Sequence, residues 1–141
     1  MIDTETRQPQ NILAIRDGEI ERYIEKDKEC PIEGLSRVKM GKEAKLARTI
    51  DTYYCDVDVN GHINSIKYIE HILDLFDIDH YRKFRIRRFD IAYVAESYCG
   101  DKLNFYTEER DDDTVCVRVT KTNAETVDAE VVRCMLKFEK I

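Results

Sequence analysis

A short polar string in the middle of the chain contains residue types that can do acid–base chemistry. Asp58, Asn60 and His62 alternate with other residues in the sequence DVDVNGHIN. A carboxylate can act as a general base or nucleophile, and an imidazole can exchange a proton near neutral pH. An amide can donate a hydrogen bond to developing negative charge. The string therefore has the groups needed for chemistry at a carbonyl.

The string lies where a predicted strand ends and the main predicted helix begins. Residues 45–54, KLARTIDTYY, have strand character, and Asn64 or Ser65 is suited to be the N-cap of the helix. Unpaired N–H groups and the helix dipole stabilise negative charge at such a start. A carbonyl oxygen placed there can be polarised without a metal ion.

Two alternatives compete with the catalytic interpretation. Asp, Asn and Gly are preferred in turns, so the string can be only a turn followed by an N-cap. It also matches the first half of an EF-hand calcium loop, with oxygens at loop positions 1, 3 and 5 and Gly61 at position 6. Position 12 is Lys67 instead of the required Glu, and the preceding segment is strand-like, so we do not expect calcium.

Periodicity predicts the elements that hold the string. Apolar side chains at spacings of three and four indicate a helix that ends at about residue 76 or 77: Ile66, Ile69, Ile72, Leu73 and Phe76. Residues 77–83 resemble a linker. Strand-like segments separated by short turns follow at 84–97, 102–110, 114–121 and 129–140. Short turns imply antiparallel pairing, so the pattern predicts an α+β domain in which one helix lies on an antiparallel sheet.

Length and composition limit the class of protein. The 141 residues are enough for one core, and a net charge of −6 disfavours nucleic acid as a partner. No apolar run approaches the about 20 residues of a membrane span, and the N-terminus lacks the pattern of a signal peptide. We therefore expect a cytoplasmic protein.

The cysteines and the remaining histidines do not indicate a metal site. The chain has 5 cysteines, far apart and without a CxxC pair, which we interpret as reduced thiols. His71 and His80 are not spaced to bind a metal together with His62, and we expect them to be surface or locally bonded residues. We expect no metal and no cofactor.

Residues 1–42 differ from the rest of the chain. They contain both prolines and a highly charged stretch, with one short helical stripe at Ile20, Tyr23 and Ile24. We expect these residues to form an arm or linker, and residues 43–141 to form the folded domain.

Two separated motifs resemble the catalytic half of acyl-acyl carrier protein (acyl-ACP) thioesterases. The first, DVNGHIN with KY at residues 67–68, is similar to the family signature D-x-N-x-H-x-N followed by K-Y. The second, YVAESYCGD at residues 93–101, is similar to the family's Y-x-x-E segment ending in G-D. The resemblance covers about residues 45–138 and implies a hotdog fold, in which an antiparallel sheet wraps around one long helix. It also implies hydrolysis of fatty acyl-ACP to free fatty acid, the termination step of fatty acid biosynthesis.

The resemblance places the family's catalytic network on Asp58, Asn60, His62 and Glu96. Thioester hydrolysis needs an activated water or a carboxylate nucleophile, a donor for the oxyanion, and a proton source for the leaving thiolate. We expect Glu96 to be the general base on water and Asp58 to orient and tune it. Asn60 and His62 would be positioning and oxyanion-side groups.

Two features leave the roles within this set open. In the related 4-hydroxybenzoyl-CoA type of hotdog thioesterase, the residue matching Asp58 is itself the nucleophile or base, so the carboxylates can exchange roles. Strand parity also does not decide whether Glu96 faces the helix, so Glu96 can instead be only an exposed strand residue. Plant members carry Cys directly after the Glu, whereas this chain has Ser97 there and Cys99 two residues on. A thiol nucleophile is therefore not expected.

Four further residues are candidate substrate contacts. Asn64 and Lys67 are at the start of the predicted helix, and Arg85 and Arg87 are in a stretch, residues 83–88, with four cations in six residues. Such a stretch can attract an acidic acyl carrier protein or the phosphate of a pantetheine arm. The alternative is a strand with a basic face or a charge-protected edge.

Other functions and the expected partners complete the prediction. The alternatives are an acyl-CoA thioesterase, an enoyl thioester hydratase and a non-catalytic hotdog module that binds or pairs. The hydratase turn has an extra residue between its Asn and His, where this chain has only Gly61, which disfavours the hydratase.

Family members carry two hotdog halves, and residues 1–42 resemble the segment between them. We therefore expect an acyl carrier protein or CoA thioester as substrate, and a homodimer or a second hotdog half as partner.

Overall fold

The computed structural model describes residues 3–6, 8–34, 38–41 and 43–141. The chain divides into two units, Met1–Gly34 and Leu35–Ile141. The first unit contains a 3₁₀ helix, η1 (Ile12–Tyr23), which is kinked by left-handed backbone conformations at Arg16, Asp17 and Gly18. None of the residues of η1 is buried.

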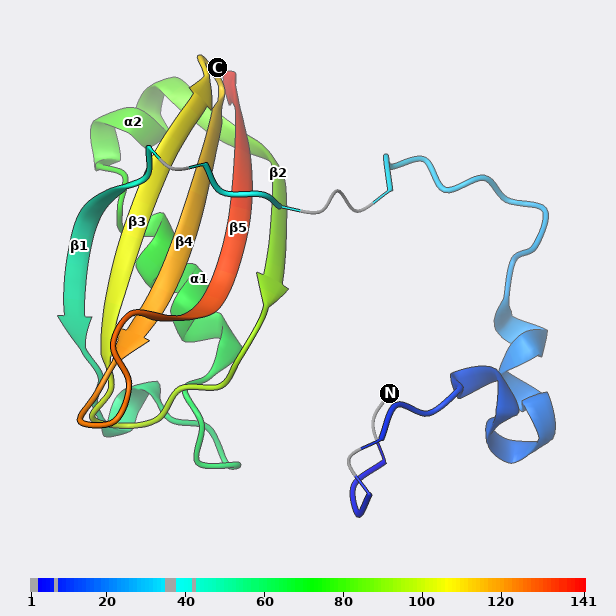
Figure 1. Ribbon diagram of the computed structural model, residues 1–141. Coiled ribbons are helices and arrows are strands. Elements are labelled where there is room, and N and C mark those ends of the chain that lie inside the picture. The colour runs from blue at the N-terminus through cyan, green and yellow to red at the C-terminus, as the bar shows by residue number, and fades with distance from the viewer. Residues whose placement is uncertain (1–2, 7, 35–37, 42) are drawn as a thin grey trace. The chain divides into compact units, whose positions relative to one another are not determined.

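Five antiparallel strands build the second unit (Figure 1). They are β1 (Lys45–Asp51), β2 (Phe84–Tyr93), β3 (Lys102–Asp111), β4 (Thr114–Thr122) and β5 (Ala129–Lys140). Their order in the sheet is β1-β3-β4-β5-β2, so β1 and β2 are its edges. Short turns join β3, β4 and β5 in antiparallel pairs, as the sequence predicts.

The end of β1 is fixed by a buried hydroxyl. Thr52 Oγ1 donates to the carbonyl oxygen of Asp101 at 2.7 Å and lies 3.1 Å from that of Tyr98. These contacts hold the chain against the turn that precedes β3. The strand therefore ends earlier than the predicted residue 54, and a short 3₁₀ turn, η2 (Tyr54–Asp56), follows.

The main helix, α1 (Ser65–Leu73), lies against one face of the sheet (Figure 1). Its N-cap is Asn64, whose side-chain oxygen accepts the Ile66 N–H at 2.9 Å, as predicted. Tyr68 and Ile72 are buried toward the sheet. The helix ends at Leu73, short of the predicted residue 76 or 77.

The residues predicted to be a linker form a second helix, α2 (Ile78–Lys83). Asp77 caps it by accepting the His80 N–H at 2.7 Å. The Tyr81 hydroxyl donates to the Leu73 carbonyl at 2.8 Å and so ties α2 to the end of α1. The linker prediction was wrong because capping residues, and not an apolar period, define this short helix. Among the described residues, no helix is long and apolar enough to span a membrane.

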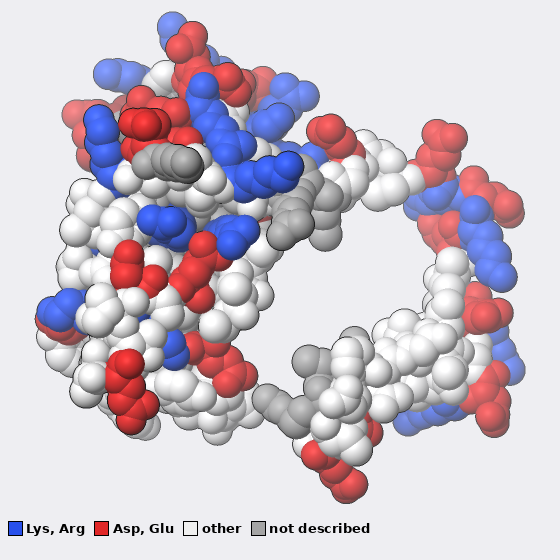
Figure 2. Space-filling model, in the orientation of Figure 1, with Lys and Arg blue, Asp and Glu red and all other residues white. Residues whose placement is uncertain are grey.

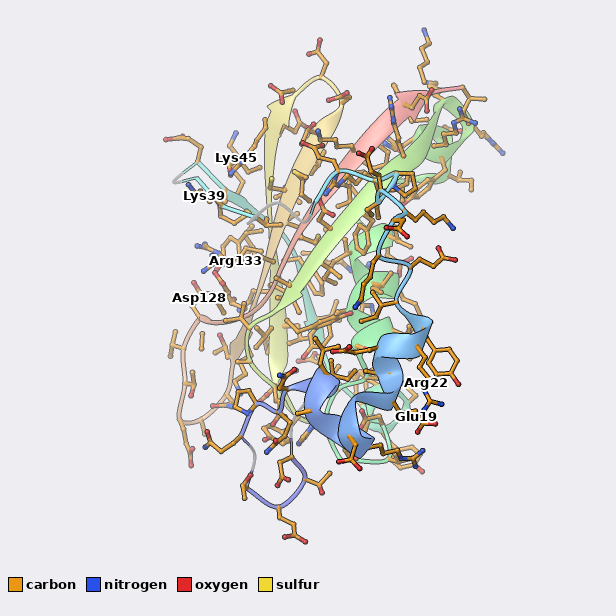
Figure 3. The ribbon with its side chains drawn as sticks, turned by 90° about the vertical axis from the view of Figure 1, so that its right-hand side faces the viewer. Glu19, Arg22, Lys39, Lys45, Asp128 and Arg133 are labelled. Carbon is orange, nitrogen blue, oxygen red and sulfur yellow. The ribbon has the colours of Figure 1, made fainter. Side chains whose placement is uncertain are left out.

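The core lies between α1 and the sheet. Alternate residues of the central strands point toward Tyr68 and Ile72 of α1: Leu103, Phe105, Val117, Val119, Val132, Cys134 and Leu136. Residues of the other parity lie on the opposite side of the sheet, where Figure 3 shows Arg133 and the nearby Asp128. One helix held against an antiparallel sheet is the predicted α+β hotdog architecture, which is confirmed.

Candidate active site

The polar string forms a tight loop between β1 and α1. The Asp58 N–H donates to the His62 carbonyl at 2.8 Å, and the Gly61 N–H donates to the Asp58 carbonyl at 3.1 Å. Oδ1 of Asp58 accepts the N–H groups of Asn60 at 2.8 Å and His62 at 3.4 Å. Gly61 has a φ of 82°, a left-handed conformation in which a side chain would be strained. Asp58 therefore fixes the backbone on which Asn60 and His62 are carried.

The segment that follows β2 carries Glu96 to this loop. The backbone oxygen of Ser97 accepts the Ile63 N–H at 2.9 Å. The Ser97 side chain is fully buried, and its hydroxyl bonds to the Tyr68 phenol on α1. Ser97 thus attaches the segment to both the loop and the helix, and its hydroxyl faces the protein interior.

The side chains of His62 and Glu96 meet. The distance from His62 Nε2 to Glu96 Oε2 is 3.4 Å, and the two side chains are 28% and 50% exposed. Asp58 is joined to His62 because its Oδ1 accepts the backbone N–H of His62. Strand parity could not place Glu96 because β2 ends at Tyr93, so Glu96 lies in an irregular segment. The structure brings two of the four predicted catalytic side chains into direct contact.

Two N–H groups at the start of α1 are already in use. The Ile66 N–H donates to the side-chain oxygen of Asn64, and the Lys67 N–H donates to its backbone oxygen, each at 2.9 Å. These groups cannot bind an oxyanion without losing the helix cap. Asn60 is exposed, so its side-chain amide can be reached from solvent.

Two residues in contact with Glu96 were not predicted as site residues. The Tyr98 hydroxyl donates to Glu96 Oε2 at 3.3 Å, and the Tyr98 ring meets His62 edge-on with ring centroids 5.2 Å apart. Lys121, on β4, donates from Nζ to the Glu96 backbone oxygen at 2.8 Å. Tyr98 lies inside the second motif, so the sequence could have indicated it as a site residue. Lys121 lies far from both motifs in the sequence, and no sequence pattern indicates its contact with Glu96.

The candidate substrate contacts at the helix start have local partners. Asn64 provides the cap. Lys67 forms an ion pair with Glu70 at 2.8 Å, and this hydrogen bond raises the pKa of Lys67. A phosphate contact by Lys67 would compete with this pair.

The basic stretch lies at the far end of β2 from Glu96. Arg85 and Arg87 are exposed, and Arg85 forms an ion pair with Glu139 at 3.3 Å. The strand ends at Tyr93, about 26 Å from Arg85 at about 3.3 Å per residue. Figure 2 shows basic and acidic side chains intermixed at the end of the molecule that carries α2. These cations are therefore not adjacent to His62 and Glu96 of the same chain.

The other two histidines are half-buried within the fold. His71 Nε2 lies 3.8 Å from Asp56 Oδ1, and its ring contacts Phe105. The His80 ring packs against Phe84 and other aromatic rings. In the parts of the chain that the structure describes, no group of three or more His, Cys, Asp or Glu is placed to hold a metal ion.

Comparison with known proteins identifies relatives of the whole domain. The family model of the acyl-ACP thioesterase C-terminal domain matches residues 39–140. The structure is similar to an acyl-ACP thioesterase from Bacteroides thetaiotaomicron VPI-5482, with 45% identity over 98% of this chain and a TM-score of 0.82. It is also similar to a 12:0-ACP thioesterase from Umbellularia californica, with 20% identity over 99% of this chain and a TM-score of 0.69. This chain covers 53% of each of those two proteins, about half of their length.

More distant structures share the fold. A 1,4-dihydroxy-2-naphthoyl-CoA thioesterase from Synechocystis is 14% identical over 68% of this chain and 81% of its own, with a TM-score of 0.54. Comparison with curated protein sequences gives no match. The family match spans both motifs and the sheet and helix that carry them, and on this evidence the chain belongs to the acyl-ACP thioesterase C-terminal domain family.

Proposed function

We propose that this chain hydrolyses the thioester of fatty acyl-ACP and releases free fatty acid and the carrier thiol. The observation that carries the proposal is the 3.4 Å contact between His62 Nε2 and Glu96 Oε2. The two residues come from the two motifs that resemble those of the family, and both side chains are partly exposed, so a substrate can contact them. Family membership supports a thioester as the bond that is cleaved.

Glu96 acts as the general base in the proposed first step. Its carboxylate takes a proton from a water molecule as the water oxygen bonds to the thioester carbonyl carbon. The carbonyl π electrons move to oxygen, and the resulting oxyanion accepts a hydrogen bond from the exposed Asn60 amide. The half-exposed position of Glu96 supports this role because water can reach it.

The second step breaks the carbon–sulfur bond. The oxyanion reforms the carbonyl, the thiolate leaves, and a proton returns to sulfur. His62 lies against Glu96 and can carry the proton between carboxylate and thiolate, since imidazole exchanges protons near neutral pH. The sum is one water consumed and one acid and one thiol formed.

Asp58 has a supporting role in this proposal. Its Oδ1 already accepts two N–H groups of its own loop, which favours a carboxylate that holds Asn60 and His62 over one that attacks substrate. The alternative is an acyl-CoA thioesterase in which Asp58 is the nucleophile or base. The half-buried position of Asp58 in the same loop as His62 supports this alternative.

We also propose that the domain of residues 43–141 pairs with a second hotdog half or a second copy, with residues 1–42 as a linker. Apolar side chains in or next to the two motifs are exposed, among them Val59, Ile66 and Val94, and β1 and β2 are the edge strands of the sheet. A partner half would cover this surface. A monomeric mass for the chain alone in light scattering at micromolar concentration would argue against self-pairing.

Free-thiol release from a panel of ACP and CoA thioesters of different chain lengths tests the activity. We expect release from ACP thioesters to be faster than from their CoA counterparts. Faster release from CoA thioesters would favour the alternative. Addition of water to an enoyl thioester without thiol release would indicate a hydratase, and no reaction with any substrate would contradict the proposal.

A further inference from the structure

We infer that Tyr98 is a positioning residue of this site, holding Glu96 and His62 together through its hydroxyl and its ring. The inference rests on the proposed thioester hydrolysis. Tyr98 contacts both partners of the central pair: its hydroxyl donates to Glu96 Oε2 at 3.3 Å, and its ring meets the His62 ring at 5.2 Å and 87°.

The two contacts restrict different motions. His62 Nε2 and the Tyr98 hydroxyl approach the same carboxylate oxygen, so together they limit rotation of the Glu96 carboxyl group. The edge-on ring limits rotation of the imidazole. The hydroxyl separation of 3.3 Å is longer than a strong O–H···O bond, and such distances in ligand-free sites often shorten when substrate excludes water.

The backbone of Tyr98 is anchored to buried groups. Its N–H donates to Asp101 Oδ2 at 2.9 Å, and its carbonyl oxygen lies 3.1 Å from the Thr52 hydroxyl. Thr52 and Asp101 are both buried. The ring therefore stands on the turn between β2 and β3, which Thr52 holds against the end of β1.

Lys121 contacts both the Tyr98 ring and Glu96. Its Nζ lies 5.4 Å from the centre of the Tyr98 ring and donates to the Glu96 backbone oxygen at 2.8 Å. A cation over the face of the ring favours this ring position. Tyr98 is 45% exposed and lies outside the hydrophobic core, so core packing does not explain its placement.

Substitutions separate the hydroxyl from the ring. Tyr98→Phe removes only the bond to Glu96, and we expect kcat to fall about three- to tenfold with KM within about twofold. Tyr98→Leu also removes the ring contact with His62 and should reduce kcat further. Tyr54→Phe is the matched control, since Tyr54 is 90% exposed and lies on η2, and it should leave both constants unchanged.

A double-mutant cycle distinguishes positioning through Glu96 from a general structural effect. Tyr98→Phe should have no further effect on single-turnover rates in a Glu96→Gln background, because the two residues act as a unit. A full additional loss in that background, a change in KM alone, or wild-type kcat for Tyr98→Phe would overturn the inference. If Tyr98→Phe keeps the wild-type kcat while Glu96→Gln loses most of it, only the inference on Tyr98 is overturned and the proposed function is still supported.

A spectroscopic readout keeps the inference testable even without activity. The chain has 3 His residues, and His62→Gln assigns the His62 imidazole signals in NMR spectra. Tyr98→Leu should shift these signals because the aromatic ring is removed from 5.2 Å. Unchanged signals would overturn the inference, whereas absence of thiol release by the wild type would contradict only the proposed function.

Discussion

The carboxylate and imidazole of the central pair come from segments with different kinds of support. His62 is part of a closed loop whose hydrogen bonds run through Asp58. Glu96 stands after the last residue of β2 and is held by Lys121 through its backbone oxygen. Because loop and segment are joined at the Ile63 N–H, we expect a change in either to alter the distance between the His62 imidazole and the Glu96 carboxylate.

Substitution of Asp58 tests whether this residue supports the loop or performs the chemistry. Asp58→Asn keeps an oxygen that can accept the two loop N–H groups, whereas Asp58→Ala leaves them without it. We expect Asp58→Ala to lower the free energy of unfolding by about 1–3 kcal/mol and Asp58→Asn by clearly less, measured by urea denaturation. Asp58→Asn should retain more thiol-release activity than Glu96→Gln. Loss of activity in Asp58→Asn as complete as in Glu96→Gln, with stability intact, would make Asp58 the base or nucleophile.

The spacing of residues in the sequence indicated part of the candidate site, and the other contacts became visible only in the structure. The alternation of Asp58, Asn60 and His62 is local, so the sequence alone could place these residues in one loop. Glu96 could be named only by resemblance, because its position depends on where β2 ends. Lys121 comes from β4, and no local pattern links a lysine in one strand to an irregular segment before another.

Among the elements, α1 and the segment after β2 are joined by a buried pair of hydroxyls. Tyr68 on α1 bonds to Ser97, and both side chains are buried. Burial raises the pKa of Tyr68, so the phenol stays neutral and can share this hydrogen bond. The pair ties the helix that follows the loop of Asp58 and His62 to the segment that carries Glu96.

Removing one member of this pair should destabilise the fold. Tyr68→Phe leaves the fully buried Ser97 hydroxyl without this partner, and we expect the free energy of unfolding to fall by about 1–3 kcal/mol. Adding Ser97→Ala should cost less than the sum of the two single changes, since no polar group is then left unsatisfied. Tyr53→Phe, at a tyrosine 62% exposed, is the control. Additive losses would show that the hydroxyl contact contributes nothing.

The elements were predictable to the extent that their signals are local. Alternating apolar residues separated by turn residues predicted β3, β4 and β5 closely. The end of α1 was missed because the apolar spacing continues beyond it to Phe76. The whole of α2 was missed because its N-cap, Asp77, and not an apolar period, marks its start. The early end of β1 depends on Thr52 and its partners in the turn before β3, which no local pattern reveals.

For the whole molecule, buried thiols link stability to alkaline pH. Cys134 lies in the core on β5, and burial raises the pKa of its thiol from the ordinary value of 9.0 to about 12. The unfolded thiol loses its proton first as pH rises, so the unfolded state binds fewer protons than the folded state above about pH 9. The Cys134 contribution is therefore complete below pH 9 and is lost progressively between pH 9 and about 12.

Replacing this thiol should make stability less sensitive to alkali. In wild type we expect Cys134 to lower the free energy of unfolding by about 1.4 kcal/mol per pH unit in that window. Cys134→Ala should show a shallower decline in urea denaturation between pH 8.5 and about 11, under reducing conditions. Cys99→Ala, at an exposed thiol, should keep the wild-type slope. The same slope in all three proteins would refute the assignment.

The overall architecture followed from the order of elements, which specifies one helix and a set of antiparallel strands. The order of elements could not predict which apolar side chains are exposed near the candidate site. Val59 and Ile66, in the loop and the helix that follow β1, are exposed, and the chain spans about half of the acyl-ACP thioesterases it resembles.

The rate of thiol release from acyl-ACP by Glu96→Gln, compared with wild type under single-turnover conditions, tests the central claim most directly. We expect a loss of about 10²- to 10⁴-fold, because the general base is replaced by an amide of the same shape. Glu125→Gln, at an exposed glutamate between β4 and β5, is the matched control and should release thiol at the wild-type rate. Equal rates for wild type and Glu96→Gln would contradict the assignment of Glu96 as the base.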